Sequence, residues 1–150
     1  MKSTYTTKSA AQTRKLGARF AKKLARKEYG TRALVIGLQG ELGSGKTNFL
    51  QGFAKGLGIK EKVLSPTFVL MKKFKIPSKR FFHMFYHIDC YRLYGQEDLL
   101  QMGLKEIITD PHNLVVIEWA DRVKNILPKE RVSATFASVD ENTRNVVLQW

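Results

Sequence analysis

Apolar side chains recur every fourth residue near the start of the chain and predict an amphipathic helix. Between Ser9 and Glu28, the residues Leu16, Phe20 and Leu24 follow this spacing, which places them on one helical face. Basic residues surround this apolar stripe: Arg14, Lys15, Arg19, Lys22, Lys23, Arg26 and Lys27. Because runs of charge most often face water, we interpret this cationic face as a solvated surface, with a nucleic-acid contact as the alternative.

A strand, a glycine-rich loop and a second helix are predicted to follow in that order. The run from Ala33 to Leu38 is short, apolar and bounded by glycine and turn residues, as expected of a buried strand in a parallel sheet. Apolar residues at helical spacing then predict a helix from Lys46 to Leu57. Gly58 is placed to end this helix.

The second half of the chain predicts more strands and two short helices. Residues 67–76 alternate loosely and residues 81–88 are rich in aromatic side chains, which together predict an antiparallel hairpin. The other expected elements are helices over Gln96–Met102 and Leu104–Thr109, split by Gly103, and strands over Leu114–Ile117, Val132–Val139 and Val146–Trp150.

Length and composition indicate one compact domain over residues 1–150. A chain of 150 residues with 43% hydrophobic and 26% charged residues can bury one core and leaves no room for a second independent active domain. Cys90 is the one cysteine, so no intramolecular disulfide and no cysteine-pair metal or redox motif is expected. The sequence shows neither a signal peptide nor a membrane-length apolar run, and we expect a soluble, cytoplasmic protein.

The charge of the chain is strongly positive. The formal net charge is +13 and the sequence pI is about 10.0, so a polyanionic partner such as nucleic acid has to be considered. Basic composition alone does not establish such a partner, since a generally cationic surface gives the same numbers.

The loop between the predicted strand and helix carries the most specific motif. Its sequence GELGSGKT, Gly40 to Thr47, matches the phosphate-binding pattern G-x-x-x-x-G-K-[ST] in the required position after a strand and before a helix. Glycines let backbone N–H groups surround a phosphate, the lysine reaches the β and γ phosphates, and the threonine hydroxyl binds Mg²⁺. We therefore predict a site for ATP or GTP with Mg²⁺, formed by Gly40, Glu41, Leu42, Gly43, Ser44, Gly45, Lys46, Thr47 and Asn48.

Two carboxylates at predicted strand ends are candidates for the catalytic and metal-binding acids of this site. Asp89 follows the apolar run FFHMFYHI and Glu118 follows LVVI, and the carboxyl ends of strands in an open α/β sheet face the ligand crevice. The spacing leaves open which acid holds the metal and which orients a water. Thr67, in the segment after the loop helix, is a candidate for a hydroxyl near the γ phosphate.

Three further residues are given ordinary structural roles. His83 and His87 fall at alternate strand positions and are interpreted as packing or surface residues. Trp119 is interpreted as a core residue, with packing on a nucleotide-dependent switch as the alternative.

The segments GELGSGKT, SPTF, HIDCYRL and IEWADR, in this order and at these spacings, resemble the TsaE family of bacterial P-loop ATPases, also called YjeE. The resemblance covers essentially the whole chain. It implies a single α/β domain of the P-loop NTPase type, with a mixed, mainly parallel sheet flanked by helices. It also implies weak ATP hydrolysis that serves threonylcarbamoyl modification of adenosine in ANN-decoding tRNAs, through a complex of the TsaD and TsaB proteins, with any tRNA contact indirect.

The same resemblance implies roles for individual residues. Lys46 and Thr47 are implied to hold the phosphates and Mg²⁺, Thr67 to belong to a switch-like loop, and Asp89 and Glu118 to be the acidic pair needed for hydrolysis. Two alternatives stay open. A small P-loop kinase would need an acceptor pocket and usually an arginine-bearing lid, and a nucleotide-dependent nucleic-acid-binding module without meaningful hydrolysis is favoured only by the charge.

Overall fold

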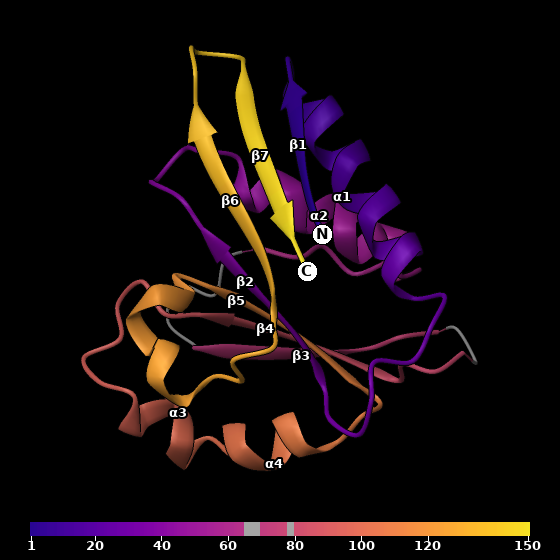
Figure 1. The fold of residues 1–150 in the computed structure, drawn as a ribbon, viewed down its shortest axis with the longest axis vertical. Coiled ribbons are helices and arrows are strands. Elements are labelled where there is room, and N and C mark those ends of the chain that lie inside the picture. The colour runs from indigo at the N-terminus through magenta and orange to yellow at the C-terminus, as the bar shows by residue number, and fades with distance from the viewer. Residues whose placement is uncertain (65–69, 78–79) are drawn as a thin grey trace.

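One mixed sheet runs through the protein. In the computed structural model, which describes residues 1–64, 70–77 and 80–150, seven strands are joined in the order β1-β7-β6-β2-β5-β4-β3 (Figure 1). The strands are β1 (Lys2–Thr7), β2 (Leu34–Gln39), β3 (Met71–Lys75), β4 (Met84–Asp89), β5 (Asn113–Glu118), β6 (Val132–Ser138) and β7 (Arg144–Gln149).

The centre of the sheet is parallel and its two edges are antiparallel. Strands β4, β5, β2 and β6 pair in parallel, whereas β3 joins β4, and β7 joins β6 and β1, in antiparallel register. Every residue of β5 and the first five residues of β2 are buried, because helices cover both faces of a central parallel strand. The carboxyl ends of β2, β5 and β4 therefore meet at one edge of a buried sheet.

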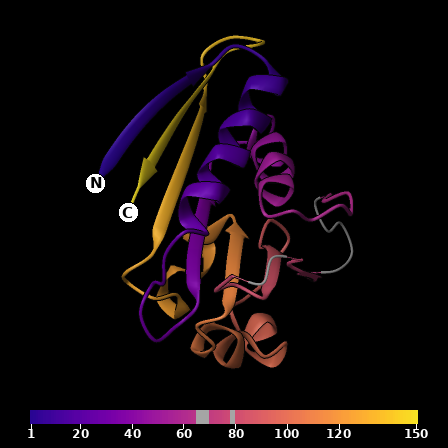
Figure 2. The ribbon, with the colours of Figure 1, turned by 90° about the vertical axis from the view of Figure 1, so that its right-hand side faces the viewer.

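Helices cover the two faces of the sheet. The five helices of the described chain are α1 (Ala10–Leu24), α2 (Lys46–Gly56), α3 (Glu97–Gln101), α4 (Leu104–Thr109) and the 3₁₀ segment η1 (Ala120–Ile126). α1 and α2 lie side by side on one face, where they share a core with Leu34, Ile36 and Leu38 of β2 (Figure 2). The apolar residues of α3, α4 and η1 pack on the opposite face, against Val35 of β2 and Ile117 of β5.

The helix ends follow from local sequence. Ser9 begins α1 because its hydroxyl accepts a hydrogen bond of 3.1 Å from the backbone N–H of Gln12, which satisfies one free donor of the first turn. α2 begins at Lys46, directly after Gly45, whose φ of 99° lies in the left-handed region that glycine adopts readily. The glycine loop therefore passes straight into the helix.

The structure confirms the α/β fold and corrects several element boundaries. α1 ends at Leu24 rather than Glu28, and the predicted hairpin is present as β3 and β4, with the expected strand start at Thr67 outside the described residues. The strand β1 and the segment η1 were not predicted. β1 carries mostly polar residues because it lies at the sheet edge, beside β7 alone. Among the described residues, no helix is long and apolar enough to cross a membrane.

Candidate functional site

The glycine loop between β2 and α2 forms a tight cradle. Gly40 and Gly43 have φ angles of 147° and 76°, which side-chain-bearing residues rarely adopt. A Cβ atom on Gly40 would lie 2.7 Å from the carbonyl oxygen of Phe136 and from Ser44 Oγ. The loop can take this path only with glycine at position 40.

Lys46 lies at the first position of α2 and points back into this loop. Its side chain is almost completely buried, and its ammonium donates to the carbonyl oxygens of Gly40 and of Glu41, the latter at 2.9 Å. Burial lowers the pKa of Lys46, while the nearby carboxylates Glu118 and Asp89 act in the opposite direction. A buried ammonium held by carbonyl oxygens is placed to exchange them for phosphate oxygens.

Asp89 and Glu118 come together as the sequence predicted. Asp89 is the last residue of β4, Glu118 is the last residue of β5, and the two are direct partners in the parallel register. Glu118 is also paired with Leu38 of β2, next to the start of the glycine loop. Both acids therefore lie at the carboxyl edge of the sheet, beside the cradle.

The environment of Asp89 differs from that of Glu118. Asp89 is partly exposed, and its Oδ1 accepts a hydrogen bond of 2.9 Å from the backbone N–H of Tyr91. Burial raises the pKa of Asp89 and the charge of Glu118 adds to this effect, whereas the Tyr91 N–H and the Lys46 ammonium lower it. Glu118, by contrast, is buried.

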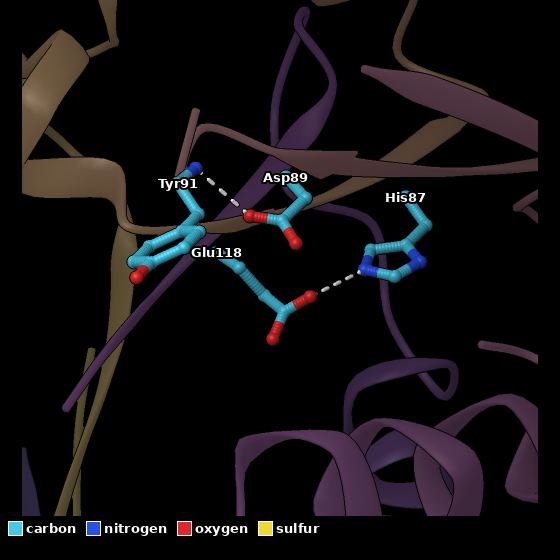
Figure 3. Close-up of polar contacts among 4 residues, drawn as sticks. All are labelled: His87, Asp89, Tyr91 and Glu118. Atoms are coloured by element: carbon cyan, nitrogen blue, oxygen red, sulfur yellow. Dashed lines mark hydrogen bonds and ion pairs between the residues drawn. The ribbon is translucent and has the colours of Figure 1, made fainter. Parts of the chain in front are cut away.

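His87 holds the carboxylate of Glu118. Its Nε2 lies 2.8 Å from Glu118 Oε2, and the two side chains are 0% and 4% exposed (Figure 3). Its other ring nitrogen, Nδ1, is buried without a hydrogen-bond partner in the described chain. The interpretation of His87 as an ordinary packing residue missed this contact. A signal was present in the sequence, because His87 precedes Asp89 by two residues and the two side chains therefore lie on one face of β4.

Trp119 closes the site from the end of β5. Its backbone lies in the left-handed region, with φ 58° and ψ 42°, and it is the one described non-glycine residue with positive φ. Such strain is found where surrounding structure enforces it, often at functional sites. The ring lies 4.6 Å from Lys46 Nζ and 5.2 Å from the ring of Tyr91, so Trp119 contacts the site instead of being only a core residue.

The residues present fit a nucleotide with Mg²⁺. Mg²⁺ binds oxygen ligands, keeps several waters and needs only one or two protein carboxylates together with substrate phosphates. No cluster of three or more His, Cys, Asp or Glu that could hold a metal ion occurs in the described residues. Thr47, an exposed residue at the start of α2, has a hydroxyl of the kind that binds Mg²⁺, and Asp89 and Glu118 have carboxylates.

The remaining predicted residues lie at the rim of the cradle or outside the described chain. Asn48 is in the first turn of α2 and its Oδ1 accepts a hydrogen bond of 3.0 Å from Arg14 of α1. Leu42 is 68% exposed at the outside of the loop. Thr67 lies outside the described residues, so its predicted place near the γ phosphate stays a prediction.

Comparison with known proteins gives one family. Residues 7–146 match the family model described as threonylcarbamoyl adenosine biosynthesis protein TsaE. A Haemophilus influenzae protein named tRNA threonylcarbamoyladenosine biosynthesis protein TsaE is 34% identical over 133 residues, which are 87% of this chain and 80% of that protein. A Treponema pallidum protein of the same name is 36% identical over 114 residues, 76% of this chain and 80% of its own length.

The fold is also similar to a solved structure. The crystal structure of YdiB from Bacillus subtilis superposes with a TM-score of 0.71 at 25% sequence identity. The match covers 99% of this chain and 84% of the YdiB chain. The similarity therefore extends over nearly the whole chain.

Proposed function

Because the chain belongs to the TsaE family of threonylcarbamoyl adenosine biosynthesis proteins, we propose that it binds ATP with Mg²⁺ and hydrolyses it slowly during tRNA modification. The observation that carries this proposal is the meeting of Lys46, at the start of α2, with Asp89 and Glu118, at the carboxyl ends of the neighbouring parallel strands β4 and β5. A phosphate-binding cation next to two carboxylates is the arrangement that phosphoryl transfer to water requires.

Each group has a defined task in this proposal. The backbone N–H groups of the glycine loop and the Lys46 ammonium bind the β and γ phosphates, and Thr47 offers its hydroxyl to the metal. Mg²⁺ held by these groups would neutralise charge on the phosphate oxygens. Asp89 and Glu118 divide the two carboxylate functions, which are to hold the metal or its waters and to orient the attacking water.

His87 acts through Glu118. A carboxylate only accepts hydrogen bonds, so the imidazole Nε2–H donates in this pair, and the buried contact of 2.8 Å fixes the direction of the Glu118 oxygens. A fixed carboxylate loses less free energy on orienting a water than a mobile one does. His87 is therefore a positioning residue rather than a catalytic one.

The partner in this proposal is a complex of the TsaD and TsaB proteins. P-loop enzymes that need a partner to complete the site hydrolyse slowly alone, and the added group accelerates them by about a thousandfold or more. Leu42 of the glycine loop and Tyr91 are exposed, and Trp119 lies beside Lys46 and Tyr91; a docking protein would contact this surface. Hydrolysis is then linked to the partner complex instead of running continuously.

The test is Mg²⁺-dependent ATP hydrolysis by the purified protein, alone and with TsaD and TsaB from the same source, with Lys46→Ala as the control. We expect slow hydrolysis that rises when the partners are added and is lost in the variant. Full hydrolysis by Lys46→Ala would refute the nucleotide site. Hydrolysis that the partners leave unchanged would refute their role while leaving the nucleotide site intact.

A further inference from the structure

A groove on the outer side of α1 and α2 is lined by an unusual concentration of cations. It has a volume of about 910 Å³ and lies between α1, the second half of α2 and the segment 58–63. Six basic residues line it, with Glu61 as the one carboxylate among its described lining residues: Arg14, Lys15, Lys22, Lys55, Lys60 and Lys62. All six side chains are exposed. We propose that this cationic groove binds the phosphodiester backbone of a folded RNA.

Backbone contact between the two helices brings these cations together. A Cβ atom on Gly52 would lie 1.8 Å from the carbonyl oxygen of Arg14, and one on Gly56 would lie 2.5 Å from that of Ala18. Such an approach is possible only with glycine, and α1 and α2 accordingly lie side by side (Figure 2). The groove is thus a fixed feature of the helix packing.

The charges of the groove are not neutralised within the protein. Neither α1 nor α2 contains an acidic residue, and none of the six basic side chains of the groove forms an ion pair within the described residues. Lys15 of the groove also stands four residues before Arg19, which lies on α1 outside the lining, and like charges at this spacing repel. This repulsion destabilises the helix. A bound polyanion would relieve it by neutralising the positive charges.

The cationic surface continues beyond this groove. A second hollow of about 580 Å³ shares Lys22, Gly56 and Gly58 with it and adds Arg26. No acidic residue is found among the described residues that line this second hollow. An extended track of positive charge matches a repeating phosphate backbone better than it matches a single phosphate group.

The side chains of the groove favour RNA over an acidic protein. Protein interfaces depend on aromatic and large apolar anchors, but the large aliphatic residues in this lining, Ile59 and Val63, are buried. Aromatic platforms for unstacked bases are also missing from the described lining. The groove therefore suits phosphates along a structured RNA, with contacts that do not depend on base sequence.

The groove is separate from the nucleotide site and touches it at one point. Arg14 lines the groove and donates to Asn48, which follows Thr47 at the start of α2. Because Arg14 also contacts the first turn of α2 next to the nucleotide site, its substitution would not test the groove alone. The choice of tRNA as the probe rests on the proposed function, whereas binding in the groove requires neither ATP nor hydrolysis.

The experiment compares two triple variants of equal charge. The groove variant is Lys15→Gln/Lys55→Gln/Lys62→Gln, with one substitution on each wall. The control variant is Lys105→Gln/Lys124→Gln/Lys129→Gln, whose exposed lysines lie on or next to the α4 and η1 side of the sheet. Each variant removes three of the thirteen net positive charges.

Binding of an unmodified tRNA transcript is measured by fluorescence anisotropy without nucleotide, over a series of KCl concentrations. We expect the groove variant to bind tRNA about tenfold or more weakly. The slope of log K against log [KCl] should also be smaller in magnitude by about two to three, since each lost phosphate contact reduces this slope by about 0.7–0.9. The control variant should stay within about twofold of the unsubstituted protein. Equal losses in both variants, or no loss in either, would overturn the proposal.

Two further measurements separate the alternatives. Tighter binding of polyglutamate than of tRNA, lost in the groove variant, would overturn the RNA assignment in favour of an acidic protein.

Melting temperatures establish that the triple variants are folded, and Lys22→Gln/Lys60→Gln provides a second groove variant with the same expectation. ATP hydrolysis should be unchanged in both groove variants, so failure of RNA binding and failure of the ATPase proposal are distinguishable.

Discussion

The contact between His87 and Glu118 gives a quantitative prediction about the site. The two side chains are almost completely buried and their nearest polar atoms are 2.8 Å apart. Hydrogen bonds to charged groups contribute about 1.5–3 kcal/mol to stability. Replacing His87 by Ala also leaves a cavity, so we expect the free energy of unfolding to fall by about 3–4 kcal/mol.

The contact itself is isolated by a double-mutant cycle. Urea unfolding is measured for the unsubstituted protein, His87→Ala, Glu118→Ala and the double variant, and the cycle removes effects that each change has alone. We expect a coupling energy of about 1.5–3 kcal/mol. His87→Gln keeps an N–H donor and should recover part of the loss, both in stability and in the rate of ATP hydrolysis.

A small coupling energy would refute this reasoning. A value below about 0.5 kcal/mol, which is the size of the additivity error for independent sites, would mean that the two side chains do not support each other. A structural role alone would also leave the turnover number of folded His87→Ala unchanged. The positioning role instead predicts a lower turnover number with little change in ATP affinity.

Three further outcomes follow from burial, charge and packing. Burial raises the pKa of Asp89 in the folded protein. Protonation of this carboxyl therefore adds to the free energy of unfolding at pH values below its unfolded pKa, and this contribution is lost as the pH rises through its folded pKa. Asp89→Asn should therefore have a higher melting temperature than the unsubstituted protein at pH 7, and the difference should disappear in acid. The variant should hydrolyse ATP poorly. A lower melting temperature at pH 7 would contradict this reasoning. Gly52→Ala places a Cβ 1.8 Å from a backbone oxygen of α1 and should lower the free energy of unfolding in urea by about 3 kcal/mol. The control Gly95→Ala, whose Cβ would have no neighbour within 4 Å among the described residues, should change it little. Equal losses would argue against the tight contact between α1 and α2. Burial raises the pKa of Cys90 to about 12, so a thiol reagent at pH 7.5 should modify it only after unfolding, and rapid labelling of the folded protein would show that Cys90 is accessible.

The elements that sequence analysis predicted are those with strong local signals. The loop GELGSGKT has glycines at the positions where positive φ occurs, and the apolar run of β2 leads directly into it. The ends of β4 and β5 were also predictable, because an acid after an apolar run marks the point where a buried strand reaches the sheet edge. Asp89 and Glu118 lie at strand ends as expected, whereas their direct pairing in the register was not predicted.

The features that sequence analysis missed depend on contacts distant in the chain. β1 is formed by pairing with β7, at the other end of the chain, and its polar sequence gives little sign of it. The partner of His87 is 31 residues away, and no local pattern identifies it. The cationic face of α1 was interpreted as a solvated surface, but its relation to Lys55 and Lys62 is visible only once the glycines of α2 bring the helices into contact.

The most direct test of the central claim is a parallel measurement of ATP affinity and ATP turnover in Glu118→Gln. The substitution keeps the size of the side chain and an oxygen that can accept from His87, but it removes the carboxylate. We expect ATP affinity within a few fold of the unsubstituted protein and turnover reduced by about a hundredfold or more. Unchanged turnover in a folded Glu118→Gln protein would contradict the assignment of this edge of the sheet as the hydrolytic site.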